Sequence, residues 1–134
     1  MHKAAVIVLF LALALHAQGP GVPDKNQRTP PQRKIDSQLL VEIYRARGEA
    51  EAKRVPPAPT GVRIDARGRA LVDIRATVTP RLQAAVRRLG GRVVATSARD
   101  RSTIAFVPLL KLETLAADAT VQFIAPAAEA ITNR

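Results

Sequence analysis

The chain of 134 residues contains no cysteine and no tryptophan, and its two histidines are His2 and His16. Without cysteine, no disulfide can staple the fold and no thiol chemistry is available. If the N-terminus is removed as argued below, no histidine remains, which excludes a Ser-His-Asp triad, a Cys-His dyad and a histidine metal site. The carboxylates lack metal-ligand spacing, and no glycine-rich phosphate loop precedes a helix. We therefore expect no enzyme: no catalytic residues, no metal and no cofactor.

Aromatic and acidic residues are also scarce. Aromatics make up 3% of the chain, and 11 Asp and Glu stand against 21 Lys and Arg, which gives a net charge of +10. Phosphate contacts from Lys and Arg dominate nucleic-acid binding, but these charges are scattered and side chains that stack on bases are nearly absent. We expect no nucleic-acid partner. The charge favours weak attraction to acidic proteins or envelope polymers.

One long apolar run is present, and it lies at the very start. Ala4 to Leu15 are all apolar, they follow the basic Lys3, and the small residue Ala17 precedes a plausible cleavage point. This pattern predicts a secretory signal peptide over residues 1–17, because the run is short for a membrane span. We expect a secreted or periplasmic protein. The open alternative is an uncleaved N-terminal anchor, which is the only membrane attachment we foresee.

Three segments of different character follow the predicted signal peptide. Residues 18–34 are rich in proline and polar side chains, which predicts disorder. Residues 35–48 read as an amphipathic helix, with a cap at Asp36 or Ser37, an end at Gly48, and an apolar stripe of Leu39, Leu40, Ile43 and Tyr44. Residues 49–68 read as a stiff Pro-rich linker. The helix would either pack on the following domain or reach a partner.

Residues 69–126 read as strand, helix, strand, strand, helix, strand. Val72 to Val78 alternate with a period of two, Pro80 to Leu89 have helical spacing, and a hairpin, a helix after Pro108 and a last short strand complete the series. This order predicts an α+β fold of the ferredoxin-like βαββαβ type, with a four-stranded antiparallel sheet and two helices on one face. The extra helix precedes it, and residues 127–134 form a C-terminal tail.

The strand phase also predicts which side chains lie on each face of the sheet. We expect a shared core beneath the helices that comprises Ile74, Leu82, Leu89, Ile104, Phe106, Leu112, Leu115 and Phe123. The opposite face would carry Leu71, Arg75, Thr77, Thr103, Ala105, Gln122 and Ile124. A face of this mixed character is either an ordinary solvated surface or a docking surface.

Five tracts carry a resemblance to a known family: Lys34–Leu40, Gly90–Val94, Arg101–Leu109, Leu112–Leu115 and Val121–Ala127. They resemble the N-terminal propeptide region of bacterial secreted subtilisin-like serine proteases. The resemblance implies a ferredoxin-like module that assists folding of the protease and inhibits it by docking its sheet on the enzyme, with the tail in the substrate cleft. The chain ends at Arg134, where the family's catalytic domain would begin, so the protease activity is not carried over.

We therefore expect a secreted, non-catalytic module that binds a subtilisin-like protease as folding aid or inhibitor, either as a stand-alone protein or from a truncated protease gene. The expected partner-binding residues on the sheet are Leu71, Thr103, Ala105 and Ile124. Those in the tail are Ala130, Ile131, Thr132, Asn133 and Arg134. The tail could equally be a frayed terminus. The alternative function is a basic, envelope-associated structural or adaptor protein without a protease partner. No pattern indicates an oligomeric state.

Overall fold

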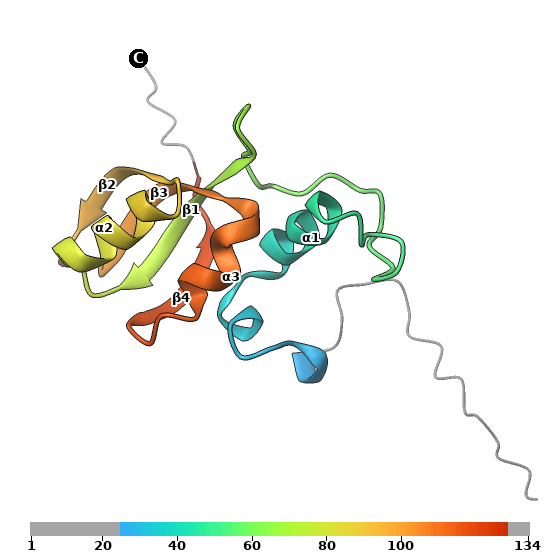
Figure 1. Cartoon of the computed structure of the whole chain (residues 1–134), viewed down its shortest axis with the longest axis horizontal. Coiled ribbons are helices and arrows are strands. Elements are labelled where there is room, and N and C mark those ends of the chain that lie inside the picture. The colour runs from blue at the N-terminus through green and yellow to red at the C-terminus, as the bar shows by residue number, and fades with distance from the viewer. Residues whose placement is uncertain (1–24, 129–134) are drawn as a thin grey trace, which may run out of the picture.

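The computed structural model describes residues 25–128, which form an α+β fold on a single four-stranded antiparallel sheet (Figure 1). The strand order β2-β3-β1-β4 is that of a ferredoxin-like unit, so the predicted fold class is confirmed. The helices are α1 (Ser37–Ala46), α2 (Pro80–Arg88) and α3 (Leu112–Ala116), and the strands are β1 (Arg69–Ala76), β2 (Arg92–Ser97), β3 (Ser102–Pro108) and β4 (Val121–Pro126). Three single-turn 3-10 helices are η1 (Lys25–Gln27), η2 (Gln32–Lys34) and η3 (Leu109–Lys111).

Helix α2 begins and ends as its sequence predicts. The Thr79 side chain accepts a hydrogen bond from the Leu82 backbone N–H, Pro80 occupies the first turn, and Gly90 follows the helix with φ of 90°. Gly91 then passes very close to the sheet: a Cβ at this position would lie 2.6 Å from the Phe106 carbonyl oxygen. The absence of a side chain at Gly91 therefore lets α2 and β2 approach β3 closely.

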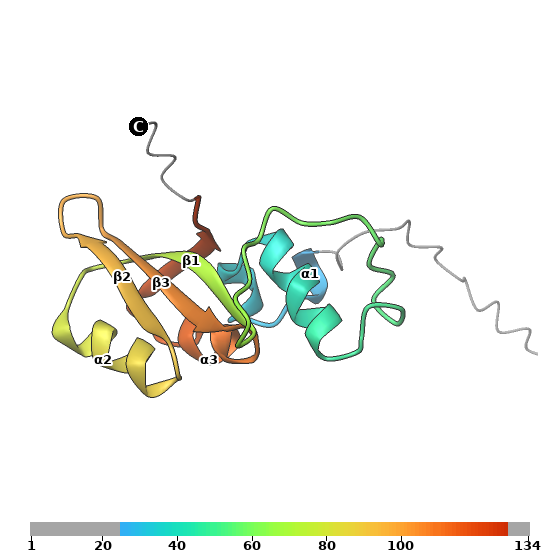
Figure 2. The same ribbon diagram turned by 90° about the horizontal axis from the view of Figure 1, so that it is seen from above.

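Helices α2 and α3 lie on one side of the sheet, and α1 lies beyond one end of the strands (Figure 2). The main core fills the space between the sheet and these helices. Its sheet residues include Val72 and Ile74 from β1, and its helix residues include Leu82, Leu112 and Leu115. These five side chains were expected in the core or on the core-facing side of β1, and they are fully or almost fully buried.

The predicted phase of β3 and β4 is wrong. Ile74 pairs with Thr103 and with Ile124, and these two residues, together with Ala105, are fully buried on the helix-covered face. Ile104, Phe106 and Phe123, which were expected in the main core, lie on the opposite face. A shift of one residue exchanges the two faces of a strand, and the apolar run from Ile104 to Val107 offers no alternation from which to read the phase.

Two β-bulges also make the phase of the strands hard to predict, because each places an extra residue in an edge strand. The pairing of β4 shifts between Phe123 and Val121, which leaves Gln122 without a partner and brings Val121 and Ile124 to the same face. In β2 the same kind of shift occurs at Val94, which is exposed. A strict period of two cannot reproduce either strand.

Helix α1 forms as predicted and packs on the sheet domain. Asp36 caps it by accepting a hydrogen bond from the Gln38 N–H, and the stripe Leu39, Leu40, Ile43 and Tyr44 joins the main core. Just before the helix, Ile35 forms a parallel bridge with Ile124, and the Asp36 N–H donates to the Ile124 carbonyl oxygen at 2.9 Å. The core therefore extends to Ile35, outside residues 69–126, to which all the side chains of the predicted core belong.

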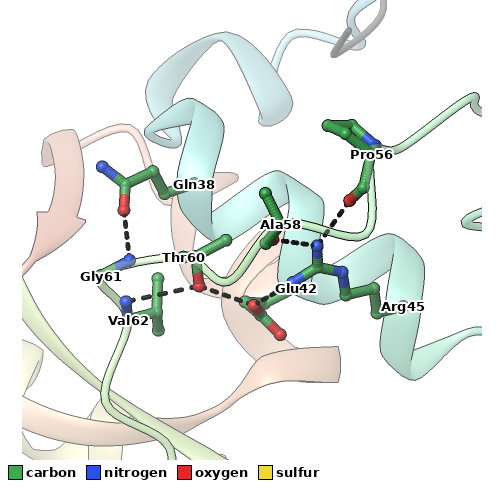
Figure 3. A network of polar contacts seen from close by, with 8 residues as sticks. All are labelled: Gln38, Glu42, Arg45, Pro56, Ala58, Thr60, Gly61 and Val62. Atoms are coloured by element: carbon green, nitrogen blue, oxygen red, sulfur yellow. Dashed lines mark hydrogen bonds and ion pairs between the residues drawn. The ribbon is translucent and has the colours of Figure 1, made fainter. Parts of the chain in front are cut away.

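The segments on both sides of α1 are more ordered than their composition suggested. Of the predicted disordered segment 18–34, the described residues 25–34 contain η1 and η2. Figure 3 shows how the Pro-rich linker is fastened along α1. Arg45 Nη2 donates to the carbonyl oxygens of Pro56 and Ala58 at 2.7 and 2.6 Å, and Glu42 Oε1 accepts from the Thr60 hydroxyl at 2.6 Å. The linker thus returns the chain along α1 to the start of β1.

Candidate docking face

The face of the sheet opposite α2 and α3 is not covered by any helix of residues 25–128 (Figure 2). Its centre is a small apolar cluster of Leu71 from β1, Phe106 from β3 and Ala127 after β4, against which Ile104 packs. The cluster is continued at the β4 edge by Phe123, which pairs with Arg75 and is 38% exposed. We call this surface the open face.

Arginine side chains cover the middle of the open face. Three guanidinium groups lie near the Phe106 ring: that of Arg92 at 5.0 Å from the ring centroid, and those of Arg63 and Arg69 at 5.8 Å. These are cation–π distances, and Phe106 is only 7% exposed. Charged side chains therefore lie against the apolar centre of this face.

A tight turn places Arg63 and Arg69 beside Phe106. Asp65 Oδ1 accepts from the backbone N–H groups of Arg67 and Arg69, and its Oδ2 accepts from Arg69 Nε at 2.7 Å. Burial acts to raise the pKa of Asp65, but these hydrogen bonds from Arg69 and Arg67 outweigh it and lower that pKa below its usual range. Gly68 closes the turn with φ of 73°. Residues 63–71 thus form a hairpin extension of β1.

The other end of the open face is polar. Asp73 accepts from the Ser102 hydroxyl at 2.6 Å and from Arg75 Nη2 at 2.9 Å, and Arg75 also donates to the Asp100 carbonyl oxygen. Four arginines, Arg63, Arg69, Arg75 and Arg92, therefore share this side of the molecule with two aspartates, Asp65 and Asp73. The surface is apolar at its centre and positively charged around it.

The sheet residues proposed from sequence as partner-binding do not all lie on this face. Leu71 does, but it is only 5% exposed. Thr103, Ala105 and Ile124 are buried beneath the helices, so the prediction that they line the open face is wrong. The tail residues Ala130, Ile131, Thr132, Asn133 and Arg134 lie outside the described residues, as does the predicted signal peptide 1–17.

Sequence reasoning missed most of the residues that form the open face. Arg92, Ile104 and Phe123 contribute to it, and Phe106 is its centre. The one available signal was a pair of arginines, Arg69 and Arg92. Each begins a strand, and in the sheet these two strands lie on either side of β3, which contains an aromatic residue. Their meeting at Phe106 depends on the register, Leu71 opposite Phe106 and Arg92 opposite Phe106, which the sequence pattern does not specify.

Two kinds of feature are absent from the described part of the chain. Residues 25–128 contain no group of three or more His, Cys, Asp or Glu side chains that could hold a metal ion. Within the same range, no helix is long and apolar enough to cross a membrane. No family model matches the chain, and searches of curated proteins and of solved structures find no match. The resemblance described above therefore rests on the quoted residues alone.

Proposed function

We propose that the chain is a non-catalytic module that binds a subtilisin-like serine protease through the open face, as a folding aid or inhibitor. The observation that carries the proposal is the apolar cluster around Phe106, against which arginine side chains lie on a sheet face that α2 and α3 leave bare. Long, flexible side chains can move aside when a partner arrives, and their charges then pair with acidic groups at the rim of the contact.

The partner proposed here follows from the resemblance together with the charge of the face. A docking surface framed by four arginines fits a protease whose complementary surface carries carboxylates at its rim and apolar side chains at its centre. The tail residues 130–134 enter the proposal through the resemblance, as an extended segment that adds main-chain hydrogen bonds in the substrate cleft.

The test is a titration of the purified chain against several secreted subtilisins, with circular dichroism to confirm folding. Arg92→Glu reverses a charge on the open face and should weaken inhibition roughly tenfold, which corresponds to about 1.4 kcal/mol. Arg88→Glu makes the same change at an exposed position of α2 and should alter inhibition by less than about twofold. Deletion of residues 129–134 should weaken inhibition while leaving the circular dichroism spectrum unchanged.

The net charge of +10 favours a second candidate, an electrostatic adaptor. The two variants separate the two functions, because an adaptor that uses overall charge should lose its partner equally with Arg88→Glu and Arg92→Glu. It should also release its partner as salt is added, whereas a contact with an apolar centre persists. A folded chain that inhibits none of the proteases would contradict the protease proposal.

A further inference from the structure

A surface hollow of about 650 Å³ lies at the outer edge of β4. The segment before α1 runs beside this strand (Figure 1). Its walls include Arg28, Arg33, Ile35, Asp36, Ser37 and Phe123. The volume is that of a site for a small ligand or a few residues of a peptide. The hollow borders the open face at Phe123 but is formed mainly by residues 26–37.

The two arginines of the hollow are poorly compensated. Arg28 donates from Nη2 to the Ser37 hydroxyl at 2.9 Å, while its Nε is shielded from water and has no acceptor within residues 25–128. Neither Arg28 nor Arg33 forms an ion pair within the same range. Arg28, whose guanidinium is partly desolvated and has no carboxylate partner within the same range, therefore gains more from an added anion than an exposed arginine such as Arg33 does.

The remaining walls indicate what kind of anion fits. Asp36 contributes one negative charge and is already engaged with the Gln38 N–H at 2.8 Å, so two arginines and one aspartate leave a net charge of +1. This charge matches a monoanion better than a doubly charged phosphate. Phe123 is 38% exposed and provides an aromatic wall, and the arginine fork matches the two oxygens of a carboxylate.

We propose that this hollow binds a carboxylate attached to an aromatic or apolar group, with Arg28 and Arg33 as the cationic residues and Phe123 as the apolar wall. The chemistry is that of a peptide C-terminus with an apolar last residue or of a free N-acyl amino acid. The site does not depend on a protease partner. Its test uses no protease, so its outcome is distinct from that of the inhibition titration.

The experiment is a titration of the isotope-labelled purified chain, followed by amide chemical shifts. The probes are N-acetyl-phenylalanine and its neutral amide, together with the peptide Ala-Ala-Ala-Phe with a free or an amidated C-terminus. The carboxylates should shift the amides of Ser37 and Phe123 at concentrations about fivefold lower than the amidated probes do, because only they pair with the arginines. Tighter binding of the peptide would identify a peptide terminus as the ligand, and tighter binding of N-acetyl-phenylalanine would identify the free acid.

Arg33→Gln is the informative variant, because Arg33 is exposed and its side chain forms no hydrogen bond or ion pair within residues 25–128. It should weaken carboxylate binding about fivefold and leave binding of the amides unchanged. Arg87→Gln removes an arginine of α2 that is likewise exposed. It should change neither the binding of the carboxylates nor the binding of the amides. Equal binding of acid and amide, or a loss that is the same in Arg33→Gln and Arg87→Gln, would overturn the proposal.

Discussion

The two faces of the sheet are both apolar at their centres, but one is covered by helices and the other by arginine side chains. Beneath the helices, Val72, Ile74 and Ile124 have no exposed surface. On the open face, Phe106 retains 7% exposure and Phe123 retains 38%. The helix-covered face is therefore permanently removed from water, while burial of the open face depends on side chains that can move.

This difference assigns different physical roles to the two faces. Truncation of a fully buried aliphatic side chain costs about 2–5 kcal/mol, whereas a cation–π contact near the surface contributes only about 0.5–1 kcal/mol. Three such contacts contribute about 1.5–3 kcal/mol together, so displacing the arginines from Phe106 costs less than opening the main core, which exposes many buried side chains. The helix-covered face holds the fold, whereas the open face is the one that the proposed function assigns to a partner.

The comparison predicts unequal costs for the same truncation on the two faces. Ile74→Ala should lower the free energy of unfolding by about 2–5 kcal/mol, because it leaves a cavity in a fully buried site. Ile104 is only half buried and pairs with Asp73, the residue before Ile74. Ile104→Ala should therefore lower the free energy of unfolding by only about 1 kcal/mol. Urea unfolding followed by far-UV circular dichroism measures both values.

A small domain has a narrow stability margin, so Ile74→Ala can leave the chain unfolded. The milder pair Ile74→Val and Ile104→Val keeps the comparison measurable, since a buried Ile→Val change costs about 0.5–1.5 kcal/mol. Equal losses at the two positions would contradict the assignment of the two faces.

The order of elements was predictable because each has a local signal. Thr79 and Pro80 are typical of a helix start and indicate where α2 begins, and Asp36 indicates where α1 begins. The packing of α1 on the sheet was one of two alternatives left by its apolar stripe. The fastening of the linker was not predictable, because it depends on carbonyl groups of Pro56 and Ala58 that meet Arg45 only after the chain has folded back.

The sequence predicted that the helices leave one face of the sheet open, but it assigned only some of the residues of that face correctly. Leu71 and Arg75 belong to it, since the alternation of β1 is regular and sets their side correctly. The phase of β3 could not be read from four consecutive apolar residues, and the buried Thr103 looks like a solvent-facing residue. The bulges at Val94 and Gln122 carry no proline or glycine that would mark them. The hollow at Arg28 and Arg33 depends on a segment whose composition indicated disorder.

The helix-covered side should also be sensitive to acid. Glu113 in α3 accepts two hydrogen bonds from Arg47 at 3.1 and 3.0 Å and one from Gln32 at 3.0 Å, which ties η2 and the end of α1 to α3. Burial acts to raise the pKa of Glu113, but the hydrogen bonds from Arg47 and Gln32 outweigh it and lower that pKa. The stabilisation that ionised Glu113 gives to the folded state is fully present above the unfolded-state pKa of Glu113. It is lost as pH falls through the lower folded-state pKa.

Urea unfolding between pH 7 and pH 3 should therefore show a fall in stability below about pH 4.5. Asp65 and Asp118 contribute in the same direction, because hydrogen bonds from neighbouring residues lower their pKa values as well. Glu113→Gln should lower stability at pH 7 by up to about 1 kcal/mol, the usual limit for a partly exposed ion pair, and should flatten the pH dependence. An unchanged pH profile in this variant would mean that Glu113 does not fasten α1 to α3.

The smallest expected change concerns the one polar side chain within residues 25–128 that is fully buried beneath the helices. Thr103 has no exposed surface, and its hydroxyl oxygen has no hydrogen-bond partner in the described part of the chain. A buried hydroxyl without a partner is unfavourable, so Thr103→Val should leave stability unchanged or raise it by about 1 kcal/mol. The matched change Thr96→Val, at the exposed residue that pairs with Thr103, should stay within about 0.5 kcal/mol. A clear loss of stability in Thr103→Val alone would show that the Thr103 hydroxyl is hydrogen-bonded. The helix-covered face would then be held by a polar contact as well as by apolar packing.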